Sequence, residues 1–206
     1  MSRGILRALA IGAAMTALAA SVSTSYAGTT GAIGQLLLPT CGATSQPFAQ
    51  FGDYKAYYGF ANNGFESDTK GWTVSGASTM NGNEPWYVNG KGTRSLSLPP
   101  KGTAASPLVC INVADTAWRM FARSTANGSL RAQVVFYGAT GNVTGILNLT
   151  DLSPSGYTAW APTSPITSVL ALPLLTTSAQ LRLTSTATSG NWQVDDVFVD
   201  PWANRG

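Results

Sequence analysis

Histidine is absent from the 206-residue chain, and its absence removes several kinds of active site. A Ser-His-Asp or Cys-His arrangement uses an imidazole as general base, and the usual zinc ligand sets combine histidine with cysteine or carboxylate. With only two cysteines, a zinc site made of cysteines alone is excluded as well. No glycine-rich loop is followed by Lys-Ser or Lys-Thr, so the sequence also offers no phosphate-binding loop of that type.

Charged residues are few, and no sign dominates. The sequence has 12 Lys and Arg against 9 Asp and Glu, for a net charge of +3. Two of the basic residues, Arg3 and Arg7, lie at the N-terminus, so ten basic residues remain beyond it and form no run. Nucleic acids and acidic membrane surfaces are bound by concentrated Lys and Arg. We therefore expect neither as a partner.

Only the N-terminus carries an extended apolar run. Arg3 and Arg7 precede a stretch of small residues and leucines at 8–22, and Ser25-Tyr26-Ala27 supplies the small residues needed before a signal peptidase site. We predict that residues 1–27 are a cleaved signal peptide and that the protein is secreted and extracellular. An uncleaved N-terminal anchor is the alternative. No later segment is long and apolar enough to span a membrane.

The two cysteines, Cys41 and Cys110, follow the predicted signal peptide. In an oxidising compartment two such cysteines pair as a disulfide. A catalytic thiol would need a histidine partner, which the chain lacks. The sequence therefore predicts a structural Cys41–Cys110 disulfide.

Short strand-like runs separated by Gly, Asn, Pro and Ser occupy the chain from Asn62 onward. Period-two alternation is clear where Leu96 and Leu98 alternate with serines, and where Leu181 and Leu183 alternate with Arg182 and threonine. Helical periodicity is not sustained beyond the signal segment. The pattern predicts an all-β protein with an antiparallel two-sheet sandwich or barrel.

An aromatic segment precedes these runs, in the sequence QPFAQFGDYKAYYGF. Gly and Pro nearby argue against a long helix. We expect residues 28–60 to form an extended arm packed on the sandwich, held by Cys41, with its aromatic residues packing instead of binding a ligand. Residues 61–202 would form the β-domain, and 203–206 a short tail.

The last strand-like run, 191–200, is apolar on both sides and carries two adjacent carboxylates, Asp195 and Asp196. This composition predicts a central strand with one carboxylate directed at a partner. Strict alternation would place Trp192, Val194, Asp196 and Phe198 on one face, and Gln193, Asp195, Val197 and Val199 on the other.

Two of these motifs together resemble a known family. NNGFES with GWTVSG at the start of the β-domain, and WQVDDVFV at its end, resemble the galactose-binding-like β-jelly-roll of extracellular carbohydrate-binding modules. The segments SLSL, SPLVCINV and WRMFARS are similar to a group of small secreted bacterial proteins of unassigned activity. The resemblance covers about residues 60–202 and implies a two-sheet antiparallel jelly-roll sandwich that binds an extracellular or cell-envelope glycan.

The same resemblance implies a structural calcium ion. In such modules an opening Glu and a closing-strand Asp lie near each other, and the matching residues here are Glu66, Asp195 and Asp196. Calcium takes six to eight oxygen ligands, and the first and last strands of a jelly-roll can be neighbours. The alternative is that these carboxylates cap turn amides or pair with an arginine such as Arg182.

Sugars are recognised by aromatic rings that stack on their apolar faces, beside polar groups that bond their hydroxyls. The best candidates in the sequence are two loop clusters, which comprise Asn83, Trp86, Tyr87 and Asn89 in the first and Tyr157 and Trp160 in the second. Trp86 could equally plug one end of the sandwich. By contrast, Trp72, Trp118 and Trp192 lie in strand-like runs and are expected in the core.

Three functions are compatible with the sequence. The leading one is a secreted, non-catalytic carbohydrate-binding module; the second is a secreted structural or protein-interaction sandwich. The third is a glycan-active hydrolase using paired carboxylates, for which Glu66 with Glu84 or Asp196 would be candidates. Glu84, however, precedes Pro85 in a turn where a carboxylate readily bonds local amides.

Overall fold

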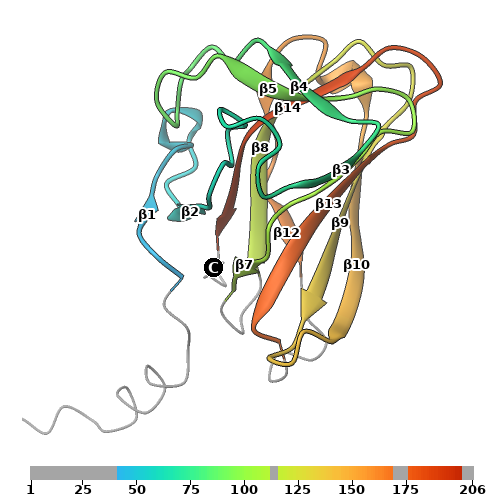
Figure 1. Cartoon of the computed structure of the whole chain (residues 1–206). Helices are drawn as coiled ribbons and strands as arrows, with labels where there is room; N and C mark the ends of the chain where they lie inside the picture. Colours follow the sequence, from blue (N-terminus) through green and yellow to red (C-terminus); the bar gives the residue numbers. More distant parts are fainter. Residues whose placement is uncertain (1–40, 112–115, 169–175, 201–206) are drawn as a thin grey trace, which may run out of the picture. The chain divides into compact units, whose positions relative to one another are not determined.

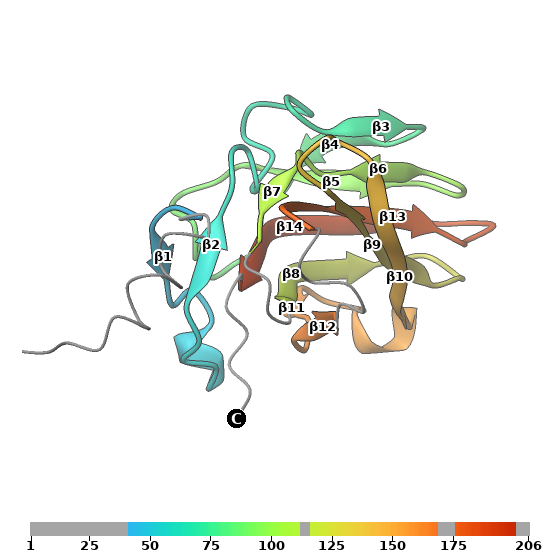
Figure 2. The same cartoon turned by 90° about the horizontal axis from the view of Figure 1, so that it is seen from below.

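The computed structural model describes residues 41–111, 116–168 and 176–200. Every strand pairing in these ranges is antiparallel, and the strands divide into two sheets (Figures 1 and 2). No α-helix occurs in them, and none of their helices is long and apolar enough to cross a membrane. The predicted all-β, antiparallel jelly-roll sandwich is therefore confirmed. The predicted signal peptide and the C-terminal tail lie outside the described residues.

The eight-stranded sheet contains β1 (Thr44–Ser45), β2 (Tyr57–Gly59), β14 (Trp192–Asp200), β5 (Arg94–Leu98), β4 (Ser78–Asn81), β8 (Thr116–Ser124), β11 (Ala161–Pro162) and β12 (Ile166–Ser168). The six-stranded sheet contains β10 (Val143–Leu152), β9 (Leu130–Tyr137), β13 (Ser178–Ser185), β6 (Thr103–Ala105), β3 (Thr73–Ser75) and β7 (Val109–Cys110). Two short 3-10 turns, η1 (Ala49–Phe51) and η2 (Pro154–Gly156), complete the described elements.

Alternating side chains of both sheets form one hydrophobic core. In β13 the inward residues Leu181 and Leu183 are fully buried, whereas Arg182 between them is only partly covered. They pack in the same cluster as Leu96 of β5 and Val194 of β14 from the other sheet. Three tryptophans, Trp72, Trp118 and Trp192, belong to this cluster, as predicted.

Strand β14 is central in its sheet, as its composition predicts. It pairs with β5 over its first three residues, with β2 near its end, and with β8 along most of its length (Figure 1). Because both faces of β14 are covered, residues 194–200 are all buried. One face of β14 therefore packs in the main core, and its other face packs in a second cluster that includes Phe48 and Tyr57 of the arm.

The predicted strict alternation along β14 is wrong beyond Asp195. The pairing with β8 shifts register between Asp195 and Phe198, and Asp196 has a positive φ of 45°. Such a bulge adds a residue to one strand and re-aims the side chains that follow it. Val197 consequently faces the main core, as Val194 does. Phe198 faces the opposite side, where it packs with Phe48, Tyr57 and Phe121.

The N-terminal arm contributes strands to the sheet as well as packing on it. Strand β2 pairs with β14, and β1 pairs with β2 (Figure 1). The predicted disulfide is confirmed, with Cys41 and Cys110 joined and their Cα atoms 5.1 Å apart. Phe48 and Tyr57 of the arm are completely buried, which agrees with their expected packing role.

A buried ion pair also joins the arm to β8. Arg119 Nη1 lies 2.6 Å from Asp53 Oδ2, and the guanidinium carbon lies 4.2 Å from the centre of the Phe48 ring. Arg119 Nε donates a second bond to the Thr163 carbonyl at 2.7 Å. Burial alone would raise the pKa of Asp53, but hydrogen bonds from Tyr57, Lys55 and Arg119 lower it below its ordinary value. The arm is therefore fixed beside the outer face of β8.

Candidate functional site

The loop between β4 and β5 is organised by the Glu84 side chain. The Glu84 carboxylate accepts hydrogen bonds from the backbone N–H of Trp86 at 2.5 Å and from that of Val88 at 2.8 Å. This is the local amide bonding expected for the turn. The backbone N–H of Glu84 in turn donates to Asp195 Oδ2 at 3.0 Å. Glu84 thus joins the Trp86 loop directly to the central strand.

Glu84, Asp195 and Asp196 form a buried carboxylate cluster in which the exposed fractions are 0%, 0% and 3%. Burial, with the neighbouring Asp196 charge, raises the pKa of Asp195 to about 8. Burial, with Glu84 next to it, raises the pKa of Asp196 to about 7, although hydrogen bonds from Asn89 oppose this rise. Adjacent carboxyl groups in a low-dielectric site cannot all ionise without strong repulsion. Burial and mutual repulsion therefore both favour the protonated forms of Asp195 and Asp196.

Trp86 lies on the surface above the arm and β8. The residue is 37% exposed. The ring packs edge-on against Phe51 at 5.1 Å between centroids and tilted against Phe121 at 5.3 Å. Trp86 is therefore held on one side by aromatic rings and remains open to solvent on the other.

A hollow of about 370 Å³ brings Trp86 together with Trp160. Its lining residues are Pro85, Trp86, Arg123, Thr158, Ala159 and Trp160. Trp160 directly precedes β11, and Ala161 of β11 is paired with Ala122 of β8, next to Arg123. Figure 2 shows β11 beside β8. The two loop clusters predicted from the sequence thus meet through one tryptophan each.

The remaining predicted ligand residues do not line this hollow. Tyr87 is 51% exposed and has a positive φ of 52°. Asn83 donates to the Glu84 carbonyl at 2.8 Å within the loop, and Asn89 donates to Asn63 Oδ1 at 2.8 Å in the opening loop, so both amides have structural partners.

Tyr157 is separated from Trp160 although the two are close in sequence. It lines another hollow with Leu149, Pro165 and Ile166. Its ring packs on Trp192 at 5.7 Å, and burial raises its pKa. We therefore take Trp86, Trp160 and Arg123 as the candidate site.

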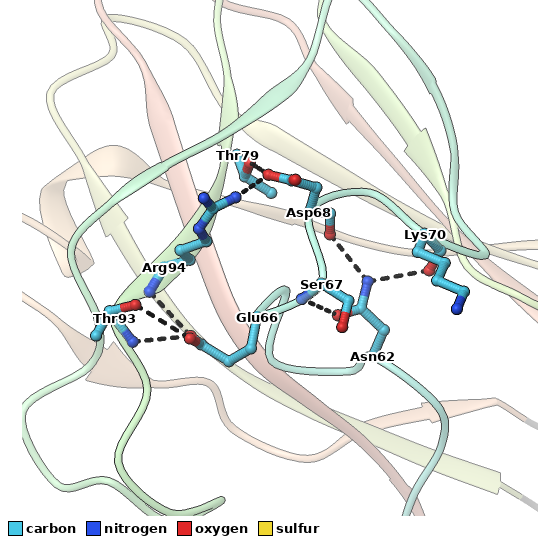
Figure 3. A network of polar contacts seen from close by, with 8 residues as sticks. All are labelled: Asn62, Glu66, Ser67, Asp68, Lys70, Thr79, Thr93 and Arg94. Carbon is cyan, nitrogen blue, oxygen red and sulfur yellow. Dashed lines mark hydrogen bonds and ion pairs between the residues drawn. The ribbon is translucent and has the colours of Figure 1, made fainter.

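Glu66 does not meet the closing strand in the way the resemblance implies. Its Oε1 accepts from the backbone N–H groups of Thr93 and Arg94, both at 2.9 Å, and its Oε2 accepts from the Thr93 hydroxyl at 3.2 Å. Figure 3 shows the carboxylate directed at these two residues. The partner that Asp195 finds is instead Glu84.

The network around Glu66 fastens the opening loop to β4 and β5. Asp68 bonds Thr79 at 2.8 Å and pairs with Arg94, while Asn62 bonds the carbonyls of Asp68 and Lys70 (Figure 3). These bonds satisfy polar groups of the loop. The bonds that Glu66 accepts from Thr93 and Arg94 are of the amide-capping kind that is the alternative to calcium binding.

The predicted calcium ligands thus have different hydrogen-bond partners: Asp195 accepts from Glu84, whereas Glu66 accepts from Thr93 and Arg94. Among the residues that the structure describes, no group of three or more His, Cys, Asp or Glu is placed to hold a metal ion. Both oxygens of Glu66 accept hydrogen bonds from Thr93 and Arg94. Calcium binding stays a prediction, with Glu66, Asp195 and Asp196 as its carboxylates.

A larger hollow of about 520 Å³ lies over β3, β6, β9 and β13. Its lining is mixed: polar residues such as Thr73, Gln133 and Arg182 stand beside the apolar residues Val74, Ala104, Ala105 and Leu183. None of its described lining residues is aromatic, so this hollow offers no ring on which a sugar could stack.

Sequence reasoning did not single out Arg123, Phe51 or Phe121 as parts of the site. Arg123 lies between the buried residues Ala122 and Ser124 of β8, so the alternation predicts that it faces outward. Which loops cover that face depends on the pairing of β11 with β8, which no local pattern specifies.

No protein-family model matches the chain, and no curated protein does either. Solved structures with similar folds include carbohydrate-binding modules, the class that the sequence resembles. The CBM22-1 xylan-binding domain from Paenibacillus barcinonensis Xyn10C is 16% identical, with a TM-score of 0.46 over 67% of this chain and 90% of that domain. A family 16 carbohydrate-binding module is 16% identical, with a TM-score of 0.47 over 68% of this chain and 96% of the module.

The enzymatically active domain of bacteriophage CBA120 tailspike protein 4 is similar at the same level. It is 13% identical, with a TM-score of 0.49, and the match covers 68% of this chain but only 21% of that one.

Proposed function

We propose that the protein is a secreted, non-catalytic module that binds a glycan of an extracellular polymer or cell envelope in the hollow between Trp86 and Trp160. The observation that carries the proposal is the meeting of these two tryptophans, from separate loops, at one hollow with Arg123. Indole rings offer a large apolar surface at low cost in conformational entropy, and sugar rings have apolar faces that stack on them.

The support beneath Trp86 favours a binding role. Phe51 and Phe121 pack against its ring, and the Glu84 carboxylate bonds its backbone N–H. A binding group held in place before the ligand arrives loses less entropy on association. The Trp86 ring is thus held by contacts with two aromatic rings, and its backbone is held by Glu84, while part of the residue remains accessible to solvent.

The carboxylates support a non-catalytic role. A glycoside hydrolase needs two carboxyl groups that reach the substrate from opposite sides of the scissile bond. Glu84 and Asp196 are buried, and Glu66 is engaged by backbone amides. The paired-carboxylate hydrolase considered from the sequence therefore has no support in the described residues.

A glycan array tests the proposal, with the purified protein compared to its Trp86→Ala and Trp160→Ala variants. Each substitution should weaken binding roughly tenfold or more, because it removes a stacking surface of the hollow. Tyr54→Ala is the matched control: Tyr54 is an exposed aromatic, 70% accessible, that does not line the hollow. Silence of the wild-type protein across plant, bacterial and host glycans would contradict the proposal.

A further inference from the structure

The Arg123 side chain distinguishes this hollow from a purely aromatic one. Arg123 is exposed on β8, opposite Gln193 of β14, and lines the hollow with both tryptophans. None of the other lining residues, Pro85, Thr158 and Ala159 among them, is charged. The guanidinium is therefore the only charge among the described residues that line the site.

Arg123 also differs from the other arginines in the described ranges, each of which has a side-chain partner. Arg94, Arg119 and Arg131 form ion pairs with Asp68, Asp53 and Asp151, and Arg182 donates to the Tyr137 hydroxyl at 3.2 Å. Of the arginines that the structure describes, Arg123 alone makes no side-chain hydrogen bond or ion pair. Its donors are therefore available to a ligand in the hollow.

A planar guanidinium is well suited to bind an oxyanion such as a carboxylate. Its parallel N–H donors bind a carboxylate through two hydrogen bonds at once, and such charge-assisted pairs are stronger than neutral hydrogen bonds. A neutral sugar hydroxyl would use only part of this capacity.

We propose, resting on the glycan-binding function above, that the glycan is acidic and that Arg123 binds the carboxylate of a uronic acid residue whose ring stacks on the tryptophans. A sulfate ester is a tetrahedral oxyanion that can also accept two guanidinium hydrogen bonds, so it is the competing anionic group in the test. Arg123 thereby determines the class of sugar, and the tryptophans provide the stacking surface.

An array that displays uronic acid, sulfated and neutral glycans tests this assignment. The wild-type protein should bind the uronic acid glycans best, and methyl esterification of their carboxylates should weaken binding about tenfold. Arg123→Gln, which keeps a polar side chain but removes the charge, should abolish the difference between acid and ester. Arg131→Gln, an exposed arginine outside the hollow, should leave it unchanged.

Different results would contradict glycan binding itself and the acidic nature of the glycan. Binding confined to neutral glycans and unaffected by Arg123→Gln would overturn the acidic assignment and leave the proposed function standing. A preference for sulfated over uronic acid glycans would overturn the carboxylate assignment. Silence on every glycan would contradict the proposed function itself. Equal melting midpoints of wild type and Arg123→Gln show that any change in binding is not a loss of fold.

Discussion

The backbone N–H of Glu84 donates a hydrogen bond to Asp195 Oδ2 at 3.0 Å, and so couples the loop that carries Trp86 to the central strand β14. The Glu84 side chain then holds the amides of Trp86 and Val88. The candidate binding site is therefore built on the same carboxylates that lie buried in the sandwich.

Replacing Glu84 with alanine should both destabilise the protein and impair the site. The change removes the acceptor for two backbone amides from a fully buried position. We expect the free energy of unfolding to fall on the order of 2–3 kcal/mol. Urea unfolding measures the loss, and glycan binding should weaken with it.

Glu66→Ala is the control for this substitution, because Glu66 also accepts from two backbone amides but is exposed. It should cost about 1 kcal/mol or less and leave binding unchanged. Equal losses of stability in the two variants would contradict the role assigned to buried Glu84.

Stability should fall as the pH rises from 5 to 8 when no divalent cation is present. The folded-state pKa values of Asp195 and Asp196 are raised to about 8 and about 7, above the ordinary value of 3.8. The folded state thus keeps protons that the unfolded chain releases above about pH 4, and stability is lost as the pH rises through the folded pKa values. Urea unfolding in chelator should show a decrease on the order of a few kcal/mol.

The Asp196→Asn variant provides the matched comparison for the pH experiment. It removes one of the two titrating groups while nearly preserving the side-chain shape. Its stability should depend less on pH than that of the wild type. A wild-type stability that is constant or rises between pH 5 and 8 would show that these carboxylates are ionised throughout.

Calcium, predicted from the family resemblance, would neutralise the same carboxylates in place of protons. It should raise the melting midpoint at pH 8, where Asp195 and Asp196 lose their protons, and have little effect at pH 5. Thermal unfolding with calcium and with chelator measures this difference. Equal midpoints at pH 8 would end the calcium prediction.

Loss of the Cys41–Cys110 disulfide should destabilise the protein. The cysteines are 69 residues apart, and a loop of that length corresponds to about 4 kcal/mol on the chain-entropy account. The double Cys41→Ala and Cys110→Ala variant should show this loss in urea unfolding. The wild-type protein under reducing conditions should match it, and a wild type insensitive to reductant would contradict the expectation.

Much of the fold was predictable because its signals are local. Alternation in β5 and β13, the double apolar face of β14 and the two cysteines indicate the sandwich, the central strand and the disulfide without knowledge of distant contacts. The alternation fails after Asp195 because a single residue, Asp196, has a positive φ, and the residues after it then point to the opposite faces of the strand. The apolar and polar pattern of the sequence does not indicate this bulge.

The site was predictable only in part. Trp86 and Trp160 stand out because each is a tryptophan in a turn-rich segment, but their meeting depends on the pairing of β11 with β8. The pairing of Glu84 with Asp195 joins residues 111 positions apart. Glu66 matched the family motif, yet its nearest amides belong to Thr93 and Arg94, and the single sequence does not show which partner it meets.

Sugar binding between Trp86 and Trp160 can be followed at the indole Nε1–H signals of ¹⁵N-labelled protein during titration with a glycan. The sequence has six tryptophans, and single Trp→Phe variants assign their signals. We expect the Trp86 and Trp160 signals to move together as glycan is added, while those of buried Trp118 and Trp192 stay in place. Binding that moves neither the Trp86 nor the Trp160 signal would contradict this expectation.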